Sequence, residues 1–121
     1  MTTGQHDFAA LVHAVAHFRD ERDWAQFHNP KDLAISVSLE AAELLEHFQW
    51  KTTAQVTALL GDDQAREAIA DEMADVLLLL VSLGEATGVD LLSAAFRKLA
   101  HNAEKYPVER ARGRAEKYDQ L

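Results

Sequence analysis

Two pairs of acidic residues constrain the fold of this chain more than any other feature. Glu40 and Glu43 are three positions apart, and so are Glu72 and Asp75. Each pair lies in a segment with helical apolar spacing, so its members share one helix face, one turn apart. Two such helices packed together would gather four carboxylates that repel one another and lose solvation. A hard divalent cation between the helices, most naturally Mg²⁺, compensates that charge and points to phosphate chemistry.

The residues around these acids are largely apolar. At about 100° per residue, the first pair shares its face with Leu33, Ser36, Leu39, Leu44 and His47. Glu72 falls within the stripe formed by Ile69, Val76, Leu79 and Leu83. A carboxylate in an apolar stripe is costly unless something compensates it. The competing interpretation, surface charges on ordinary acid-rich helices, stays open at this point.

Helical periodicity accounts for the whole chain, and nothing in it is typical of a strand. We expect four helices, at about residues 7–22, 30–48, 63–85 and 91–106. A polar connection with a short helical turn near 54–60 separates the second and third, and a charged tail begins near 108. Asn29, Asp62 or Asp63, and Asp90 stand where helix caps are needed, and Pro30 suits a first helical position. The length fits a single domain, residues 1–121.

The predicted architecture is an all-α four-helix bundle that assembles as an oligomer. The run from Val76 to Val81 is apolar almost all round its helix, which requires burial on several sides. One small chain of four helices can hardly cover it. We therefore expect a second copy of the chain to do so.

Composition excludes several classes of function. The formal net charge is −8, and no basic footprint of the kind typical of nucleic-acid binding occurs before the C-terminal region. The chain has no cysteine, which excludes disulfides, thiolate zinc sites and cysteine nucleophiles. Its N-terminal segment lacks a signal-peptide pattern, and its longest apolar run is too short to span a bilayer. We expect a soluble, cytoplasmic protein with neither nucleic acid nor membrane as a partner.

Two further groups of residues suit a nucleotide. Trp24 and Trp50 sit at helix edges beside polar residues, where a flat base can stack, although packing is the commoner role of tryptophan. Lys98, Asn102 and Lys105 share one helix face and suit phosphate and sugar, although an ordinary solvated face has the same composition.

Histidines carry less information. His13 and His17 have the i, i+4 spacing of zinc ligands, but no third ligand is evident, so we assign them to the surface or to packing. His47 faces the same way as Glu40 and fits either an outer contact of the metal site or plain packing. An oxygen-reactive di-metal bundle needs Glu-x-x-His pairs, which this chain lacks. A non-catalytic helical module explains the helices but not the acids within apolar stripes.

The order Glu40-x-x-Glu43-x-x-Glu46, followed by Glu72-x-x-Asp75, resembles the MazG-type all-α nucleoside triphosphate pyrophosphohydrolases. The resemblance extends over about residues 18–118, and the segments that flank the acids are similar to the dCTP pyrophosphatase branch. It is carried by the segments ERDWAQFHNPKDLAISVSLEAAELLEHFQWK (21–51), DEMADVLLLLVSLGEATGVDL (71–91) and KYPVERARGRAEKY (105–118). The sequence departs from the family at 38–39 and 41–42, where relatives often carry small residues between the acids.

The resemblance implies that a nucleoside triphosphate and water give the monophosphate and pyrophosphate. dCTP or a modified dCTP is the expected substrate, with dUTP and phosphoribosyl-ATP types as alternatives. The implied metal is Mg²⁺, with Mn²⁺ as an alternative, on Glu40, Glu43, Glu72 and Asp75. Glu46 is then a general base, an outer contact of the attacking water, or a surface acid. The implied substrate contacts are Trp24, His28, Trp50, Lys98, Asn102, Lys105 and Tyr106, and the implied assembly is a homotetramer built from dimers.

Overall fold

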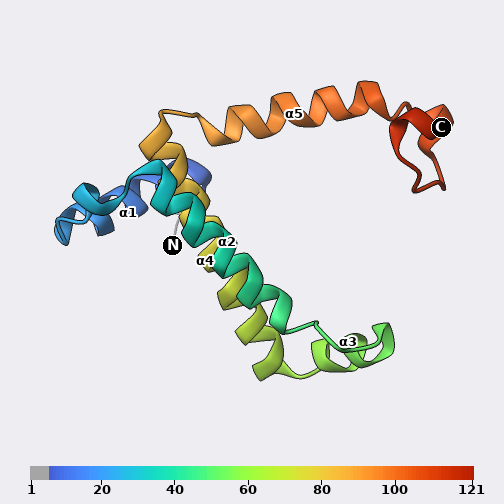
Figure 1. Ribbon diagram of the computed structural model, residues 1–121, viewed down its shortest axis with the longest axis horizontal. Helices are drawn as coiled ribbons and strands as arrows, with labels where there is room; N and C mark the ends of the chain where they lie inside the picture. Colours follow the sequence, from blue (N-terminus) through green and yellow to red (C-terminus); the bar gives the residue numbers. More distant parts are fainter. Residues whose placement is uncertain (1–5) are drawn as a thin grey trace. The chain divides into compact units, whose positions relative to one another are not determined.

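The computed structural model describes residues 6–121, and no strand occurs among them (Figure 1). The α-helices are α1 (Phe8–Glu21), α2 (Pro30–Glu46), α3 (Thr53–Leu60), α4 (Asp63–Thr87), α5 (Leu91–Lys105) and α6 (Val108–Ala111). Two 3₁₀ turns complete the secondary structure, η2 (Ala25–Phe27) and η3 (Tyr118–Gln120). The all-α prediction is confirmed. Residues 1–5, part of the segment in which no signal peptide was predicted, lie outside the described residues.

The chain divides into two units after Gly88, which ends α4 in the left-handed conformation with φ 74°. The first unit contains α1 to α4, and the second, Val89–Leu121, contains α5, α6 and η3. The four predicted long helices are α1, α2, α4 and α5, with ends within two residues of the predicted ones. The turn predicted near 54–60 is helix α3, and the predicted tail includes α6 and η3.

Side-chain caps explain where the long helices begin. The Asn29 carboxamide oxygen accepts from the Asp32 backbone N–H at 2.9 Å, directly before Pro30 at the first position of α2. Asp62 and Asp90 cap α4 and α5 in the same way. Each cap satisfies a backbone N–H that has no partner within its own helix. The predicted caps are therefore confirmed, with Asp62 rather than Asp63 as the residue before α4.

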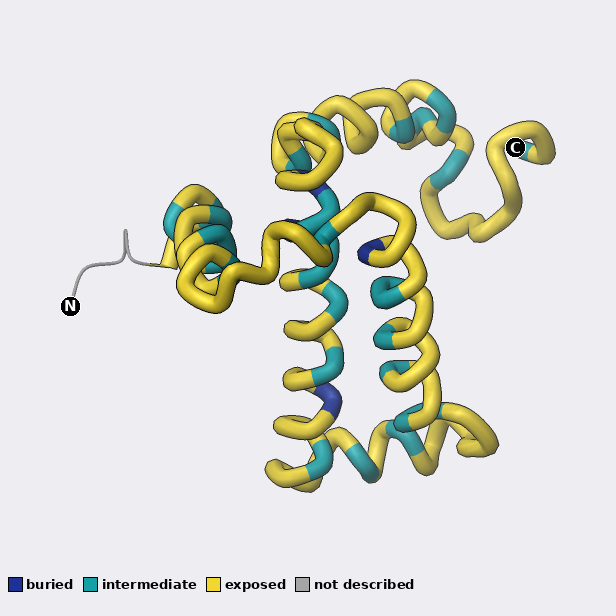
Figure 2. The backbone as a smooth tube through the Cα atoms, turned by 60° about the vertical axis from the view of Figure 1, so that its left-hand side comes forward, coloured by how far each residue is buried: buried dark blue, intermediate teal, exposed yellow. Residues whose placement is uncertain are grey.

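Helices α2 and α4 lie side by side and antiparallel, connected through α3 (Figures 1 and 2). Leu33 from α2 and Ile69 from α4 are almost fully buried, and the less exposed positions of each helix recur at helical spacing around them. Glu40 and Glu72 occupy positions within these two stripes, as predicted. Leu39 does not belong to the packed face as predicted, because its side chain is 62% exposed.

Many large apolar side chains remain exposed around this small core. On α2 and α4 they include Ile35, Leu39, Leu45, Met73, Leu77 and Leu78. Phe96 and Leu99 of α5 are 66% and 65% exposed. Exposed apolar surface is characteristic of interaction sites where it is extensive. No helix within residues 6–121 is, by itself, long and apolar enough to cross a membrane.

Candidate metal centre

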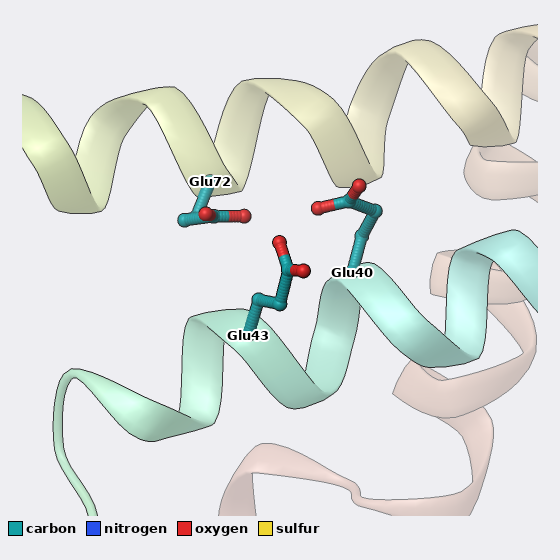
Figure 3. Close-up of side chains that lie close together, drawn as sticks. All are labelled: Glu40, Glu43 and Glu72. Carbon is teal, nitrogen blue, oxygen red and sulfur yellow. The ribbon is translucent and has the colours of Figure 1, made fainter.

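Three carboxylates meet in the space between α2 and α4. Glu40 and Glu43 point from α2 and Glu72 points from α4 toward the same place (Figure 3). One oxygen of each carboxylate lies within 4.8 Å of the other two. The spacing of three along α2 stacks its two acids on one face, and the antiparallel partner places Glu72 opposite them. The three acids thus form a cluster of oxygen ligands from two helices.

The cluster lacks the partners that buried carboxylates need. The Oε2 atoms of Glu40 and Glu72 are buried and accept no hydrogen bond. None of the Lys and Arg ion pairs within the described part of the chain involves Glu40, Glu43 or Glu72. Buried polar atoms without partners are costly, and they are rare in folded proteins. A hard cation at this position satisfies the orphaned oxygens, so the residues present fit a divalent metal ion.

The pKa values of the two α2 acids reflect their crowding. The pKa of Glu43 is raised above its ordinary value, first by the contact with the Glu40 carboxyl group and then by its charge. For Glu40, the contact with Glu43 acts to lower the pKa, but desolvation, the contact with Glu72 and the charges of Glu72 and Asp75 together raise it. Without a metal ion, the cluster therefore resists full ionisation.

These raised values predict that metal-free protein gains stability when one acid loses its charge. The pKa of Glu43 lies above the ordinary Glu value of 4.5. The protonated Glu43 side chain therefore contributes folding stability that is fully present below pH 4.5 and is lost as the pH rises through the pKa of the folded state. At pH 7 in a chelator, we expect Glu43→Gln to unfold at a higher temperature than wild type, with the difference closing as pH falls. Thermal unfolding by circular dichroism measures this.

The matched control is Glu67→Gln, which removes the same charge from an exposed position of α4 outside the cluster. It should move the unfolding temperature less than Glu43→Gln does. A Glu43→Gln protein that unfolds below wild type at pH 7 in chelator would mean that the acids support the fold without metal.

Asp75, the fourth predicted ligand, lies beside the cluster rather than within it. It is exposed, and it lines a hollow of about 500 Å³ together with Glu40. Its charge is close enough to contribute to the raised pKa of Glu40. The structure thus brings three of the four predicted ligands together and places the fourth near them.

The hollow has apolar walls and acids at its edge. Helix α1 contributes Leu11, Ala14, Val15, Phe18 and Arg19, and α4 contributes Leu78, Leu79 and Ser82. Trp24 and His28 complete the wall, with their ring centroids 6.4 Å apart. The Nδ1 atom of His28 is buried without a hydrogen-bond partner. A flat ring bound here would lie between largely apolar surfaces, beside the rings of Trp24 and His28.

The wall formed by α1 was missed by sequence reasoning. Its residues at helical spacing predicted an apolar face, but spacing does not identify the surface that this face meets. Phe18 packs edge-on against Trp24, with ring centroids 5.8 Å apart, and this contact fixes one side of the hollow. The proximity of Phe18 and Trp24 in sequence was the available signal.

Trp50 and Glu46 line a different and shallower hollow where α2 ends, shared with Lys51 and residues of α3. Trp50 is 92% exposed, and its φ of 65° is uncommon for a bulky residue. Within one chain, Trp24 and Trp50 therefore do not face a common space. Glu46 is exposed at the last position of α2, and its charge adds to the raised pKa of Glu43.

The predicted phosphate contacts belong to the second unit. Lys98 is exposed on α5, whereas Asn102 and Lys105 are half-buried near its end. Tyr106 follows α5, and its backbone N–H donates to the Asn102 carbonyl at 2.9 Å. The Lys105 ammonium lies 4.8 Å from the centroid of the Tyr118 ring. These residues all lie in the second unit, Val89–Leu121.

The fold and the cluster define an all-α protein with an acidic cluster, suited to a divalent cation, between two antiparallel helices. The chain belongs to the MazG-like family, because the sequence model of that family matches residues 35–121. The resemblance identified from the acidic motif is thereby confirmed.

Individual proteins extend this comparison. The chain is 42% identical over 106 residues to dCTP pyrophosphatase 1 of Rattus norvegicus and 40% identical over 106 residues to dCTP pyrophosphatase 1 of Homo sapiens. Each match covers 88% of this chain and 62% of the relative. The chain is also similar to the crystal structure of a pyrophosphatase from Archaeoglobus fulgidus. That match has 35% identity and a TM-score of 0.77, and covers 88% of this chain and 98% of the other.

Proposed function

We propose that this protein is a divalent-metal-dependent nucleoside triphosphate pyrophosphohydrolase, with dCTP or a modified dCTP as substrate. Water attacks the α-phosphorus, the bond from that phosphorus to the bridging oxygen breaks, and the monophosphate and pyrophosphate are released. One observation carries the proposal. Glu40 and Glu72 belong to one carboxylate cluster, and each has a buried oxygen without a hydrogen-bond partner, in a chain of the MazG-like family. The similarity to proteins named pyrophosphatases supports the reaction.

Glu40, Glu43 and Glu72 are the proposed metal ligands, with Asp75 as the fourth. A bound Mg²⁺ or Mn²⁺ supplies positive charge to the triphosphate and to the leaving pyrophosphate. Each of these carboxylates belongs to a helix rather than to a loop, so its position between α2 and α4 is well defined. Helix-anchored groups position a ligand more accurately than groups on loops do.

Glu46 is the proposed acceptor of the proton from the attacking water. It follows Glu43 by three positions, so the two share a helix face. Its charge acts on Glu43, which supports a place near the cluster, although it also lines the outer hollow with Trp50.

The hollow lined by Trp24 and His28 is the proposed site of the base. Its apolar walls suit the faces of a pyrimidine, and its edge at Glu40 and Asp75 lets the phosphates reach the metal site. The His28 ring, which also lines the hollow, is the proposed neighbour of the base on the side of Trp24. Lys98, Asn102, Lys105 and Tyr106 are the proposed contacts of the phosphates and sugar.

We also propose that the chain works as a homotetramer built from dimers. The exposed apolar side chains of α2 and α4 support this, because water-facing surface of that kind favours association. Trp50 supports it as well, since an exposed tryptophan on uncommon backbone geometry is expected at a contact. In such an assembly, Trp50 of one copy reaches the base held by another.

Light scattering at micromolar concentration should give a mass close to four times the 13.5 kDa of the chain. The apolar surface on α2 and α4 drives the association, so Leu77→Glu should lower the mass. A monodisperse wild-type monomer would contradict the assembly without touching the assignment of the metal ligands.

The activity is tested with a panel of triphosphates and Mg²⁺, with ³¹P NMR to identify the products. The panel contains dCTP, 5-methyl-dCTP, CTP, dUTP, dTTP, dATP, dGTP and phosphoribosyl-ATP. We expect monophosphate and pyrophosphate in equal amounts, with the highest kcat/KM for the deoxycytidine nucleotides. A preference for dUTP or phosphoribosyl-ATP would overturn the base assignment alone. Release of orthophosphate, or no hydrolysis of any nucleotide, would overturn the reaction.

A further inference from the structure

Lys105 is held by an aromatic ring rather than by an acid. Its ammonium nitrogen lies 4.8 Å from the centroid of the Tyr118 ring, within the range of a cation–π interaction. No carboxylate forms an ion pair with Lys105 among the described residues. The side chain is half-buried at the last position of α5, whereas its neighbours Ala103 and Glu104 are exposed. Its position is therefore set while its charge remains available.

The ring reaches Lys105 because the C-terminal segment folds back on the end of α5. Gly113 adopts a φ of 75°, which turns the chain after α6. Arg114 then ties the returning segment, since its guanidinium contacts Glu116 at 3.2 Å and donates to the Gln120 carbonyl at 3.3 Å. The Tyr118 ring packs edge-on against Tyr106, with ring centroids 6.2 Å apart. These contacts fix the ring over Lys105.

A ring and an acid prepare a lysine for phosphate in different ways. A carboxylate neutralises the ammonium and occupies its N–H donors, so a phosphate must displace it. The face of a tyrosine ring attracts the cation electrostatically but keeps its charge. Lysine also loses rotamer entropy when a phosphate fixes it, and a side chain that is already held loses less.

We propose that Tyr118 is a positioning residue, whose ring holds the Lys105 ammonium ready for the phosphates of the nucleotide. This rests on the proposed function, which assigns Lys105 to those phosphates. It gives the C-terminal segment, which reads in sequence as a charged tail, a part in substrate binding.

The test is a double-mutant cycle on the full chain with KM and kcat as readouts. Tyr118→Leu should raise KM about two- to fivefold with kcat unchanged, as expected for one partly exposed cation–π contact. Tyr118→Phe keeps the ring and should restore the wild-type KM. In the Lys105→Gln background, Tyr118→Leu should add nothing. Equal effects of Tyr118→Leu in both backgrounds, or an unchanged KM in the single variant, would overturn the proposal.

Two readouts independent of turnover separate this proposal from the proposed function. The ε-methylene protons of Lys105 should show an upfield ring-current shift in NMR spectra, kept in Tyr118→Phe and lost in Tyr118→Leu. Pyrophosphate with Mg²⁺ should bind Tyr118→Leu more weakly by the same factor as KM changes. If wild type hydrolyses no nucleotide, the proposed function fails, and pyrophosphate binding alone decides the role of Tyr118. If Tyr118→Leu loses helical signal, Tyr118→Met provides a second variant without a ring, judged by the same criteria.

Discussion

Replacing Glu72 by Gln should lower kcat by at least about a hundredfold, since even outer partners of metal ligands cost ten- to a hundredfold when removed. The substitution removes a ligand charge from α4 but keeps the size of the side chain and its helix propensity. Glu72 is the single member of the cluster that α4 contributes. Its loss leaves the two α2 acids without a counterpart across the interface between the helices. Steady-state hydrolysis with Mg²⁺ measures the effect, and Glu43→Gln should behave similarly.

A control variant and a measurement of helix content distinguish loss of a metal ligand from loss of structure. Glu67→Gln removes an exposed acid from the same helix and should leave kcat within about twofold of wild type, as expected for a surface change. Circular dichroism should show full helical content for Glu72→Gln. Unchanged activity of Glu72→Gln with Mg²⁺ would contradict its assignment as a ligand, and loss of helix would mean that the acid is structural.

The second large effect concerns the base. Trp24→Ala should raise KM by roughly ten- to a hundredfold, which corresponds to a stacking contribution of about 1–3 kcal/mol. Trp24 lines the hollow beside His28 and Glu40, so its loss removes one wall of the proposed base site. Hydrolysis at saturating substrate should persist, because the acids that hold the metal are untouched. The preference among nucleotides should also shrink.

Trp24→Phe is the control, because it keeps an aromatic face and the contact with Phe18. Trp50→Ala tests the other tryptophan, and it should raise KM similarly if Trp50 of one copy completes the site of another. Substrate should quench tryptophan fluorescence in wild type and less in either variant. An unchanged KM and preference in Trp24→Ala would move the base site away from this hollow.

Much of the local structure follows from the sequence because its causes are local. Asn29, Asp62 and Asp90 each cap a backbone N–H three residues ahead, so helix starts are readable from single positions. Glu40 and Glu43 share one helix face because they are three positions apart, which follows from helical geometry alone. Their meeting with Glu72 required a second helix, and the apolar stripes of both helices predicted that contact.

The remaining features depend on contacts between distant residues. The apolar stripe of α4 predicted a central place for Glu72, but the distance of Asp75 from the cluster depends on how α4 is rotated against α2, which spacing does not give. Trp24 and Trp50 were grouped by chemistry, whereas the structure places them in different hollows of the chain. The segment near 108 read as a charged tail because its folding depends on Tyr118 meeting Lys105, thirteen positions earlier in the sequence.

Direct binding of Mn²⁺ tests the metal centre without substrate. Free Mn²⁺ is measured by electron paramagnetic resonance as it is titrated into wild type, Glu72→Gln and Glu67→Gln at neutral pH. We expect saturable binding to wild type and Glu67→Gln, competition by Mg²⁺, and at least about tenfold weaker binding to Glu72→Gln. Equal binding by wild type and Glu72→Gln, or no binding by wild type at millimolar Mn²⁺, would contradict a metal site built by Glu40, Glu43 and Glu72.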